Sequence, residues 1–259
     1  MRYASIKAVT FDATNTILGV AEPVGMTYAD ICQKYGLFAQ RDAMDAQFRL
    51  NYRQYDRLWP CFTPTDNGNE KKQFADVTPA SRRWWYCVVA DTVRASCLTD
   101  EVSKIEAHLP SIVSEAYDHY ADAGAWMVED TAKYTLSELV DRGYKLGIIS
   151  NTDERLRGVL EQIGLARYFH SILLSSELKI AKPSAEIFKQ AMWQLNLSDP
   201  NQLLHIGDQT EVDCVAAQDA GCQAAQLRPN LYKKQVYYVD GMHTLAVLSD
   251  VFVLLDDHS

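Results

Sequence analysis

The sequence predicts an α/β protein whose core is a doubly wound parallel sheet with helices on both faces. The second half of the chain alternates short apolar runs with segments of helical period, as parallel sheets with crossover helices do. An earlier apolar run at residues 6–11 stands apart from this alternation. Residues 19–125 lie between and have a helical pattern, which predicts an inserted helical domain because a crossover needs only a dozen or more residues.

The elements of the core follow from the position of each apolar run. The first, "IKAVTF", has the composition of a strand buried on both faces. We expect the strands of the sheet at residues 6–11, 144–150, 171–175, 203–208, 222–227 and 235–240. Helical segments alternate with them, at residues 130–142, 153–163, 184–196, 211–220 and 243–255. The carboxyl ends of such strands should face one crevice, where ligands bind.

The inserted segment is expected to contain four helices. One carries an apolar stripe that steps by three or four residues: Val102, Ile105, Leu109, Val113, Ala116 and Tyr120. Pro110 predicts a kink or a second start there. Another helix is expected at residues 81–97 and two more before Arg57, with a polar loop at residues 63–81. We therefore expect a core domain of residues 1–18 and 126–259, with residues 19–125 inserted.

Composition excludes several classes of protein. The 259 residues are 47% hydrophobic and 23% charged, as in globular proteins. A net charge of −9 argues against broad phosphate contact with nucleic acid. No segment reaches the roughly 20 apolar residues of a membrane helix, and the stretch "MRYASIKAVTFD" does not have the apolar h-region that we would expect of a secretory signal. We expect an intracellular, cytoplasmic protein with reduced core thiols at Cys32, Cys61, Cys87, Cys97, Cys214 and Cys222.

Polar side chains end three of the predicted strands. Asp12, Ser150 and Asp208 follow apolar runs and should meet at one edge of a parallel sheet. Two carboxylates this close repel each other, and a divalent cation relieves the repulsion. Oxygen ligands without a nearby His or Cys favour Mg²⁺. Lys182 could supply positive charge, and Asp213 could cap its helix, support the metal or hold Lys182.

Each of these residues also has an ordinary structural interpretation. An Asp after a strand is common as a turn former or helix N-cap. Lys182 taken alone could be a solvated lysine, and Ser150 could cap the helix that starts near Asp153. The order and spacing of the residues carry the functional signal.

Four segments together resemble a known family. "FDATNT", "IISNTD", "AKPSAEIF" and "HIGDQTEVD", in this order, are similar to the motifs of the haloacid dehalogenase superfamily. The resemblance covers nearly the whole chain and is weakest over residues 60–80. It implies a Rossmann-like core with an α-helical cap inserted after the first motif, which agrees with the predicted insertion.

The resemblance also implies roles for the residues. Asp12 would be the nucleophile that forms an aspartyl-phosphate, and it would bind the metal with Asp208 and the backbone carbonyl of Thr14. Asp213 would lie beside Lys182 and support the metal.

A second set of residues would bind the phosphate. The resemblance implies that Ser150 and the amide of Asn151 bind the phosphoryl oxygens at a helix N-terminus. Lys182 would neutralise both the nucleophile and the phosphoryl group. Positioning and charge stabilisation dominate phosphoryl transfer in general.

Thr14 departs from the family pattern. Phosphatases of the superfamily have a second aspartate here, which protonates the leaving group and then activates water; Asn15 likewise replaces a usual glycine. General acid–base catalysis contributes about 10²–10⁴ in rate, so the intermediate should form but hydrolyse slowly. Asp153 or an acid of the loop at residues 63–81 could substitute.

These features leave several functions open. The first is a slow, Mg²⁺-dependent phosphohydrolase acting on a small phosphorylated metabolite. The second is a catalytically silent protein that binds a ligand or a protein partner. A dehalogenase ranks lower, because dehalogenases need no metal and usually have an aromatic residue at position 14. A nucleotide-binding oxidoreductase ranks last, because no G-x-G-x-x-G follows the first strand.

The remaining candidates are expected to be structural. We predict that most of the five tryptophans, and His205, are core residues. Hinges near residues 18–22 and 123–128 would let the inserted domain close and exclude water.

Overall fold

The computed structural model describes residues 3, 5–64, 79–98, 102–228, 237–239 and 242–256, with the backbone alone at 237–239. The chain forms two compact units. The core unit consists of Met1–Gly19, Met127–Thr152 and Leu160–Ser259. The helical unit consists of Val20–Trp126 and Asp153–Val159.

The core unit contains a seven-stranded sheet in the order β5-β4-β1-β6-β7-β9-β8. Its strands are β1 Ala8–Phe11, β4 Lys145–Ser150, β5 Ser171–Leu174, β6 Leu203–Gly207, β7 Gln223–Leu227, β8 Tyr237–Val239 and β9 Met242–Leu245. The first six in the order are mutually parallel, and β8 alone runs antiparallel, against β9. The α/β fold is confirmed.

Strand β1 lies in the middle of this sheet, between β4 and β6. Phe11 is in register with Ile148 on one side and Ile206 on the other. The N–H of Asp12 extends the pairing by donating to the carbonyl of Ile206 at 2.8 Å. All four residues of β1 are buried, as a central strand covered on both faces requires. The register brings the carboxyl ends of β4, β1 and β6 side by side.

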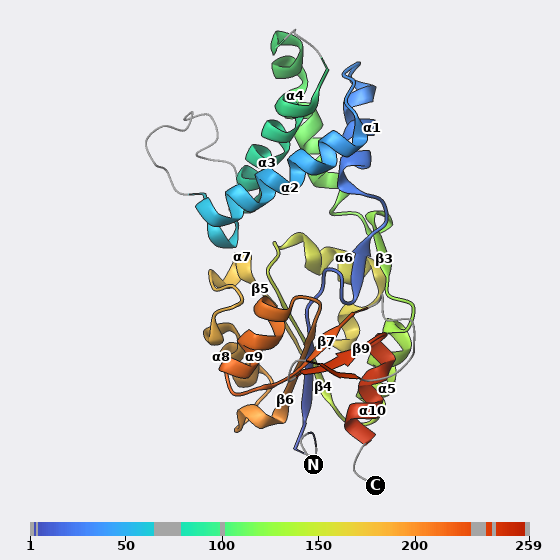
Figure 1. Ribbon diagram of the computed structural model, residues 1–259, viewed down its shortest axis with the longest axis vertical. Coiled ribbons are helices and arrows are strands. Elements are labelled where there is room, and N and C mark those ends of the chain that lie inside the picture. The colour runs from blue at the N-terminus through green and yellow to red at the C-terminus, as the bar shows by residue number, and fades with distance from the viewer. Residues whose placement is uncertain are drawn as a thin grey trace. The chain divides into compact units, whose positions relative to one another are not determined.

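Helices cover both faces of the sheet (Figure 1). The helices are α5 Ala132–Asp141, α6 Arg155–Ile163, α7 Ser175–Leu178, α8 Ala185–Gln194, α9 Ala216–Asp219 and α10 Val251–Asp256. Helices α8 and α9 lie on one side of the sheet and α5 and α10 on the other. Ile187 and Phe188 of α8 are fully buried in one core cluster with Ile149 of β4. Burial of such side chains stabilises the unit by about 1.5–3 kcal/mol each.

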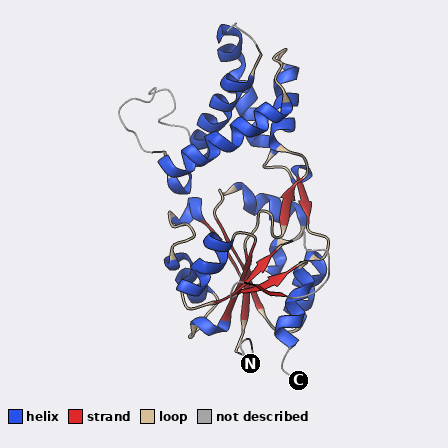
Figure 2. Ribbon diagram, in the orientation of Figure 1, coloured by secondary structure: helices blue, strands red, loops and turns tan. Residues whose placement is uncertain are grey.

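The long helices in the described part of the helical unit are α1 Val24–Lys34, α2 Arg41–Leu58, α3 Ala80–Ser96 and α4 Val102–His119 (Figure 2). The predicted stripe of α4 is buried except at its first residue, Val102, which is 64% exposed. Helix α4 continues through Pro110, so the predicted second start is wrong. Pro110 is exposed.

Two short strands outside the main sheet were not predicted. Strands β2 Leu18–Val20 and β3 Trp126–Val128 pair with each other. The division between the two units falls inside both strands. Runs of three residues are too short to show a strand period in sequence.

The remaining short helices are 3₁₀ turns and one π-helix. The 3₁₀ turns are Pro60–Phe62, Ala123–Ala125, Ala166–Tyr168, Pro200–Gln202 and Leu248–Asp250. The π-helix, Thr210–Val215, opens the segment that the sequence predicted as one helix at 211–220. A π-helix is indistinguishable from an α-helix by its apolar period over so few residues.

The C-terminal region also differs from the prediction. Residues 243–255 were expected to be helical, but Met242–Leu245 is strand β9, which pairs with β7. Helix α10 covers only Val251–Asp256. Tertiary pairing with the edge of the sheet overrides the local helical pattern here.

Most of the predicted core residues are buried. Trp59 and Trp84 pack in one aromatic cluster, whereas Trp193 on α8 is 74% exposed and is not a core residue. The six cysteines form no disulfide bonds with one another, as expected, but only Cys32, Cys214 and Cys222 are buried. The polar loop predicted at residues 63–81 falls largely on residues 65–78, which lie outside the described part. Among the described residues, no helix combines the length and the apolar character that crossing a membrane demands.

Candidate active site

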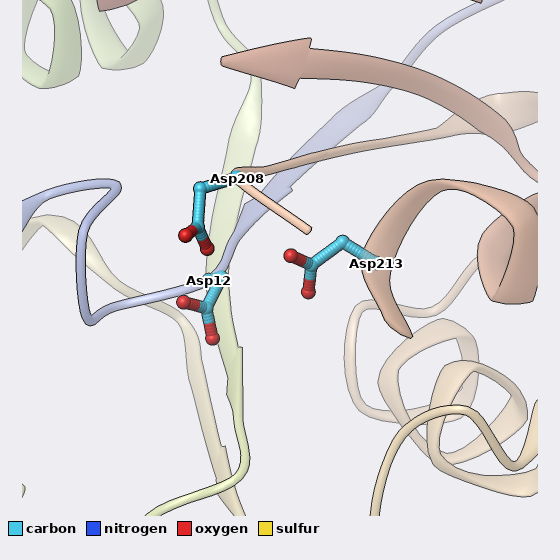
Figure 3. A group of neighbouring side chains, drawn as sticks. All are labelled: Asp12, Asp208 and Asp213. Carbon is cyan, nitrogen blue, oxygen red and sulfur yellow. The ribbon is translucent and has the colours of Figure 1, made fainter. Parts of the chain in front are cut away.

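Three carboxylates converge at the carboxyl edge of the central strands (Figure 3). Asp12 follows β1, Asp208 follows β6, and Asp213 lies in the π-helix. One oxygen from each carboxylate lies within 4.8 Å of the others. The structure thus brings Asp12, Asp208 and Asp213 together, three of the residues that the sequence singled out as candidate metal ligands.

Local packing holds Asp213 in place. Its Oδ2 accepts a hydrogen bond from the N–H of Gln209 at 2.9 Å, and the side chain is completely buried. Gly207, the last residue of β6, lies directly against it, and a Cβ on Gly207 would collide with the Asp213 carboxylate. The absence of a side chain at position 207 therefore permits the approach.

Lys182 links the carboxylates. Its Nζ lies 2.8 Å from Oδ1 of Asp12 and 2.5 Å from Oδ1 of Asp213, and its side chain is 1% exposed. Burial disfavours the charged ammonium, but the charges of Asp12 and Asp213 outweigh it and raise the pKa of Lys182. Lys182 is thus a buried, charged partner rather than a solvated surface lysine.

Asn151 fixes the loop that carries Lys182. Its side-chain amide donates to the carbonyl of Lys182 at 2.8 Å, and its Oδ1 accepts the N–H of Lys182 at 2.8 Å. The peptide bond between Lys182 and Pro183 is cis. Sequence reasoning assigned Asn151 only a phosphoryl-binding amide and missed this side-chain role, because no spacing rule connects positions 31 residues apart.

Ser150 ends β4 and is 2% exposed. The interpretation of Ser150 as a helix cap is wrong. Helix α6 begins only at Arg155, whose N–H donates to Oδ1 of Asp153 at 3.0 Å. The hydroxyl of Ser150 is therefore not engaged in capping that helix.

The turn after Asp12 has an unusual backbone. Thr14 is partly exposed and forms a β-bridge with Leu18. Asn15 has a φ of 62° and donates its N–H to the carbonyl of Leu18 at 2.6 Å. Asn is among the residues that tolerate this left-handed conformation, which explains how it occupies a position where the family usually has glycine.

The electrostatics of the three carboxylates differ. Burial, with the nearby charges of Asp12 and Asp213, raises the pKa of Asp208 to about 6. Burial also works against ionisation of Asp213, but the hydrogen bond from His205 and the charge of Lys182 prevail and lower its pKa. Oδ1 of Asp208 is buried and has no hydrogen-bond partner among the described residues.

This donor set fits a hard divalent cation. The candidate ligands are all carboxylate oxygens, which Mg²⁺ prefers. Three carboxylates against one ammonium leave the cluster with excess negative charge. The unpartnered oxygen of Asp208 offers a ligand atom that nothing else in the described part of the chain satisfies.

Asp153 does not have the properties of the missing general acid. Both of its oxygens pair with Arg155, Oδ2 at 2.7 Å, and Oδ2 also accepts the Nε1–H of Trp85 at 2.6 Å. Burial raises the pKa of Asp153, but the hydrogen bond and charge of Arg155 outweigh it, so the net shift is downward. A carboxylate stabilised as an ion is a poor proton donor at neutral pH.

His205 is a core histidine, as predicted, but it also reaches the site. It is fully buried in β6, with Nδ1 at 3.0 Å from Oγ1 of Thr10 and Nε2 at 3.5 Å from Oδ1 of Asp213. The sequence signal that could have found this contact is the alternation of strand faces, which puts His205 and Gly207 on one side of β6.

The model of the haloacid dehalogenase-like hydrolase family matches residues 6–221 of this chain. The chain belongs to the haloacid dehalogenase-like hydrolase family. The match spans every residue of the carboxylate cluster, together with Thr14, Ser150, Asn151 and Lys182.

Similar proteins agree with this membership. Haloacid dehalogenase-like hydrolase domain-containing protein 3 of Xenopus laevis is 28% identical over 241 residues, covering 93% of this chain and 92% of that protein. Its Homo sapiens counterpart is 30% identical over 203 residues, covering 78% and 74%. The crystal structure of the putative hydrolase YfnB from Bacillus subtilis, bound to magnesium, superimposes with a TM-score of 0.64 at 16% identity, covering 97% of this chain and 99% of that one.

Proposed function

We propose that this haloacid dehalogenase-like hydrolase is a Mg²⁺-dependent phosphohydrolase that acts on a small phosphorylated metabolite through an aspartyl-phosphate on Asp12. The observation that carries the proposal is the buried ammonium of Lys182, bonded at 2.8 Å to Asp12 within a cluster of three carboxylates. Packing alone does not require such a concentration of charge, which is costly to bury.

The proposed metal ligands are Asp12, Asp208, Asp213 and the backbone carbonyl of Thr14. When bound, Mg²⁺ would neutralise the carboxylates and draw charge from the phosphoryl oxygens. YfnB, which shares the fold, binds magnesium in its crystal structure, and this supports the same metal here.

The chain's own groups would hold the phosphoryl group in line with Asp12. The hydroxyl of Ser150, at the end of the strand beside β1, and the main-chain amide of Asn151 would bind its oxygens. The ammonium of Lys182 would offset the charge that Asp12 and the phosphoryl group share. Because the side chain of Asn151 fixes the backbone of Lys182, the phosphate-binding segment and the lysine are positioned as one unit.

We further propose that residues 19–125 act as a cap that selects the substrate. The described part of this cap is mainly helical, and residues 63–81 would contribute to selection. The feature of the substrate that the site would recognise is its phosphoryl group.

Thr14 limits the second half of the proposed reaction. A threonine hydroxyl cannot take a proton from water at neutral pH, so hydrolysis of the aspartyl-phosphate would be slow. The same residue is the observation that favours a second candidate, a catalytically silent protein that binds a ligand or partner.

The decisive experiment compares the natural protein with Asp12→Asn on an activated aryl phosphate in the presence of Mg²⁺. We expect measurable turnover by the natural protein, its loss in Asp12→Asn, and its loss when a chelator removes the metal. Rapid quenching in acid should trap a phosphoryl adduct on the natural protein, and alkali or hydroxylamine should release it, as expected of an acyl phosphate. Equal background rates for both proteins would favour the silent candidate.

A further inference from the structure

A buried histidine that the proposed reaction does not use lies behind the carboxylate cluster. His205 belongs to β6, has no exposed surface, and packs edge-on against Phe188 at 5.2 Å between ring centroids. Its two ring nitrogens face different polar partners: Thr10 of the adjacent strand β1, and Asp213. The imidazole ring therefore connects Thr10 in the interior of the sheet with Asp213 in the candidate active site.

The partners determine which nitrogen donates. Oδ1 of Asp213 already accepts a hydrogen bond from the ammonium of Lys182 at 2.5 Å. An ionised carboxylate has no proton, so it can only accept hydrogen bonds. Nε2 of His205, 3.5 Å from the same oxygen, must therefore carry a proton, because a lone pair there would face negative charge. Burial lowers the pKa of His205, which favours the neutral ring. In the neutral ring, Nδ1 accepts the hydroxyl proton of Thr10.

We infer that His205 is a positioning residue: its Nε2–H holds the Asp213 carboxylate, and through it the Lys182 ammonium, in the place where Lys182 meets Asp12. The donation from Nε2 stands whether or not Nδ1 is also protonated, so the inference does not depend on the titration of the ring. Thr10 sets the orientation of the ring, and the N–H of Gln209 fixes the other oxygen of Asp213 at 2.9 Å. The role of His205 in catalysis rests on the proposed function, whereas its hydrogen bonding does not.

The expected effect is moderate. At 3.5 Å the contact is at the outer limit of a hydrogen bond, and Asp213 retains Gln209 and Lys182 as partners. Because a hydrogen bond to a charged group contributes more than a neutral one but weakens with distance, loss of His205 should lower kcat by about tenfold.

The hydrogen bond can be tested without any substrate. Two-bond ¹H–¹⁵N correlation spectra of the histidine-labelled full-length protein should show His205 with a proton on Nε2. Spectra of ¹⁵N-lysine-labelled protein should show a protected ammonium signal from Lys182, which Lys182→Met identifies. His205→Phe keeps an aromatic ring against Phe188 but removes the donor, and it should broaden or remove the ammonium signal. His205→Gln keeps a donor near Nε2 and should retain the signal.

Kinetics then connect the hydrogen bond to the reaction. With an aryl phosphate and Mg²⁺, we expect His205→Phe to lower kcat by about tenfold at nearly constant KM. His205→Gln should stay within about threefold of the natural protein, and Thr10→Val should fall between the two, with Thr10→Ser as its matched control. Thermal unfolding of each variant shows whether the fold is retained.

The outcomes separately test the hydrogen bonding of His205, the proposed function and the effect of His205 on catalysis. A proton on Nδ1 alone, or an unchanged Lys182 ammonium signal in folded His205→Phe, overturns the inference even if the natural protein is an active phosphohydrolase. Absence of turnover in the natural protein overturns the proposed function but leaves the spectra to decide whether His205 positions Asp213 and Lys182. Equal kcat for His205→Phe and His205→Gln in an active enzyme overturns the catalytic part of the role.

Discussion

Thr14 is the residue that we expect to limit the rate of the proposed reaction. It lies two positions after Asp12 and is partly exposed, in a turn held by the pairing of Asn15 with Leu18. Its chemistry was evident from sequence, because a hydroxyl and a carboxyl differ in pKa wherever they are placed. That Asp153 does not replace the missing acid emerged only from its pairing with Arg155 and Trp85.

Restoring the acid should raise activity. We expect Thr14→Asp to increase steady-state turnover of an aryl phosphate by about 10²-fold or more, since general acid–base catalysis is typically worth 10²–10⁴. Thr14→Asn, which adds a polar group of the same size but no proton transfer, is the matched control. Turnover that stays the same in Thr14→Asp would mean that another step, such as formation of the aspartyl-phosphate, limits the rate.

Asp208 should make the stability of the metal-free protein depend on pH. Its pKa in the folded protein is about 6, above the ordinary value of about 3.9. The folded state therefore binds the proton more tightly, and the contribution of Asp208 to the free energy of unfolding decreases as pH rises from about 4 to about 6. Above about pH 6 Asp208 is ionised and lowers the free energy of unfolding by its full amount, and below about pH 4 it has no such effect.

This dependence can be isolated with Asp208→Asn. At pH 8 and without metal, we expect the variant to have a higher free energy of unfolding than the natural protein, and the difference should vanish near pH 4. Added Mg²⁺ should stabilise the natural protein at pH 8 and have little effect on Asp208→Asn. Urea denaturation at several pH values measures both effects, and a difference that is independent of pH would contradict the assignment.

At the scale of elements, the end of β6 and the π-helix after it shape the site together. Gly207 ends the strand, and the π-helix Thr210–Val215 then turns Asp213 back against it. The spacing of Asp208 and Asp213 can be seen in the sequence, but the π-helical geometry between them cannot be predicted from it. Likewise, the strand β9 is formed by pairing with β7, which a local pattern does not encode.

Gly207→Ala should displace the Asp213 carboxylate and so disrupt the candidate active site. The new methyl group would collide with the Asp213 carboxylate, and such overpacking typically costs about 1–3 kcal/mol. We expect a lower free energy of unfolding and a reduced kcat, because displaced Asp213 no longer holds Lys182. Gly19→Ala is the matched stability control, since no atom lies within 4 Å of a Cβ there. If Gly207→Ala keeps the stability and kcat of the natural protein, the close packing of Gly207 on Asp213 is not required.

At the scale of the whole molecule, the chain passes between its two units at the paired strands β2 and β3, and again at either end of Asp153–Val159. The N–H of Ala21 donates to the carbonyl of Ala125 at 2.9 Å, and the N–H of Glu129 to that of Ile17 at 2.9 Å. The hinges that we expect near residues 18–22 and 123–128 coincide with this pair of strands. Closure of the inserted segment remains a prediction.

Limited proteolysis can test the hinges. We expect cleavage at residues 18–22 and 123–128 to slow in the presence of Mg²⁺ and a phosphate mimic, because closure would restrict backbone opening there. Asp12→Asn treated in the same way is the control for ligand effects unrelated to the site. Equal cleavage rates with and without the ligands would count against hinge closure.

The sequence by itself determined the α/β class and the helical pattern of residues 19–125, and it singled out Asp12, Thr14, Lys182 and Asp208 as candidate site residues. These follow from local period, residue type and order along the chain, which are properties of short segments. Only the tertiary structure decided that Asn151 anchors Lys182, that His205 contacts Asp213, and that residues 242–245 form a strand. Such contacts join residues that are distant in sequence or face each other across elements, and they depend on strand order and packing that no local pattern contains.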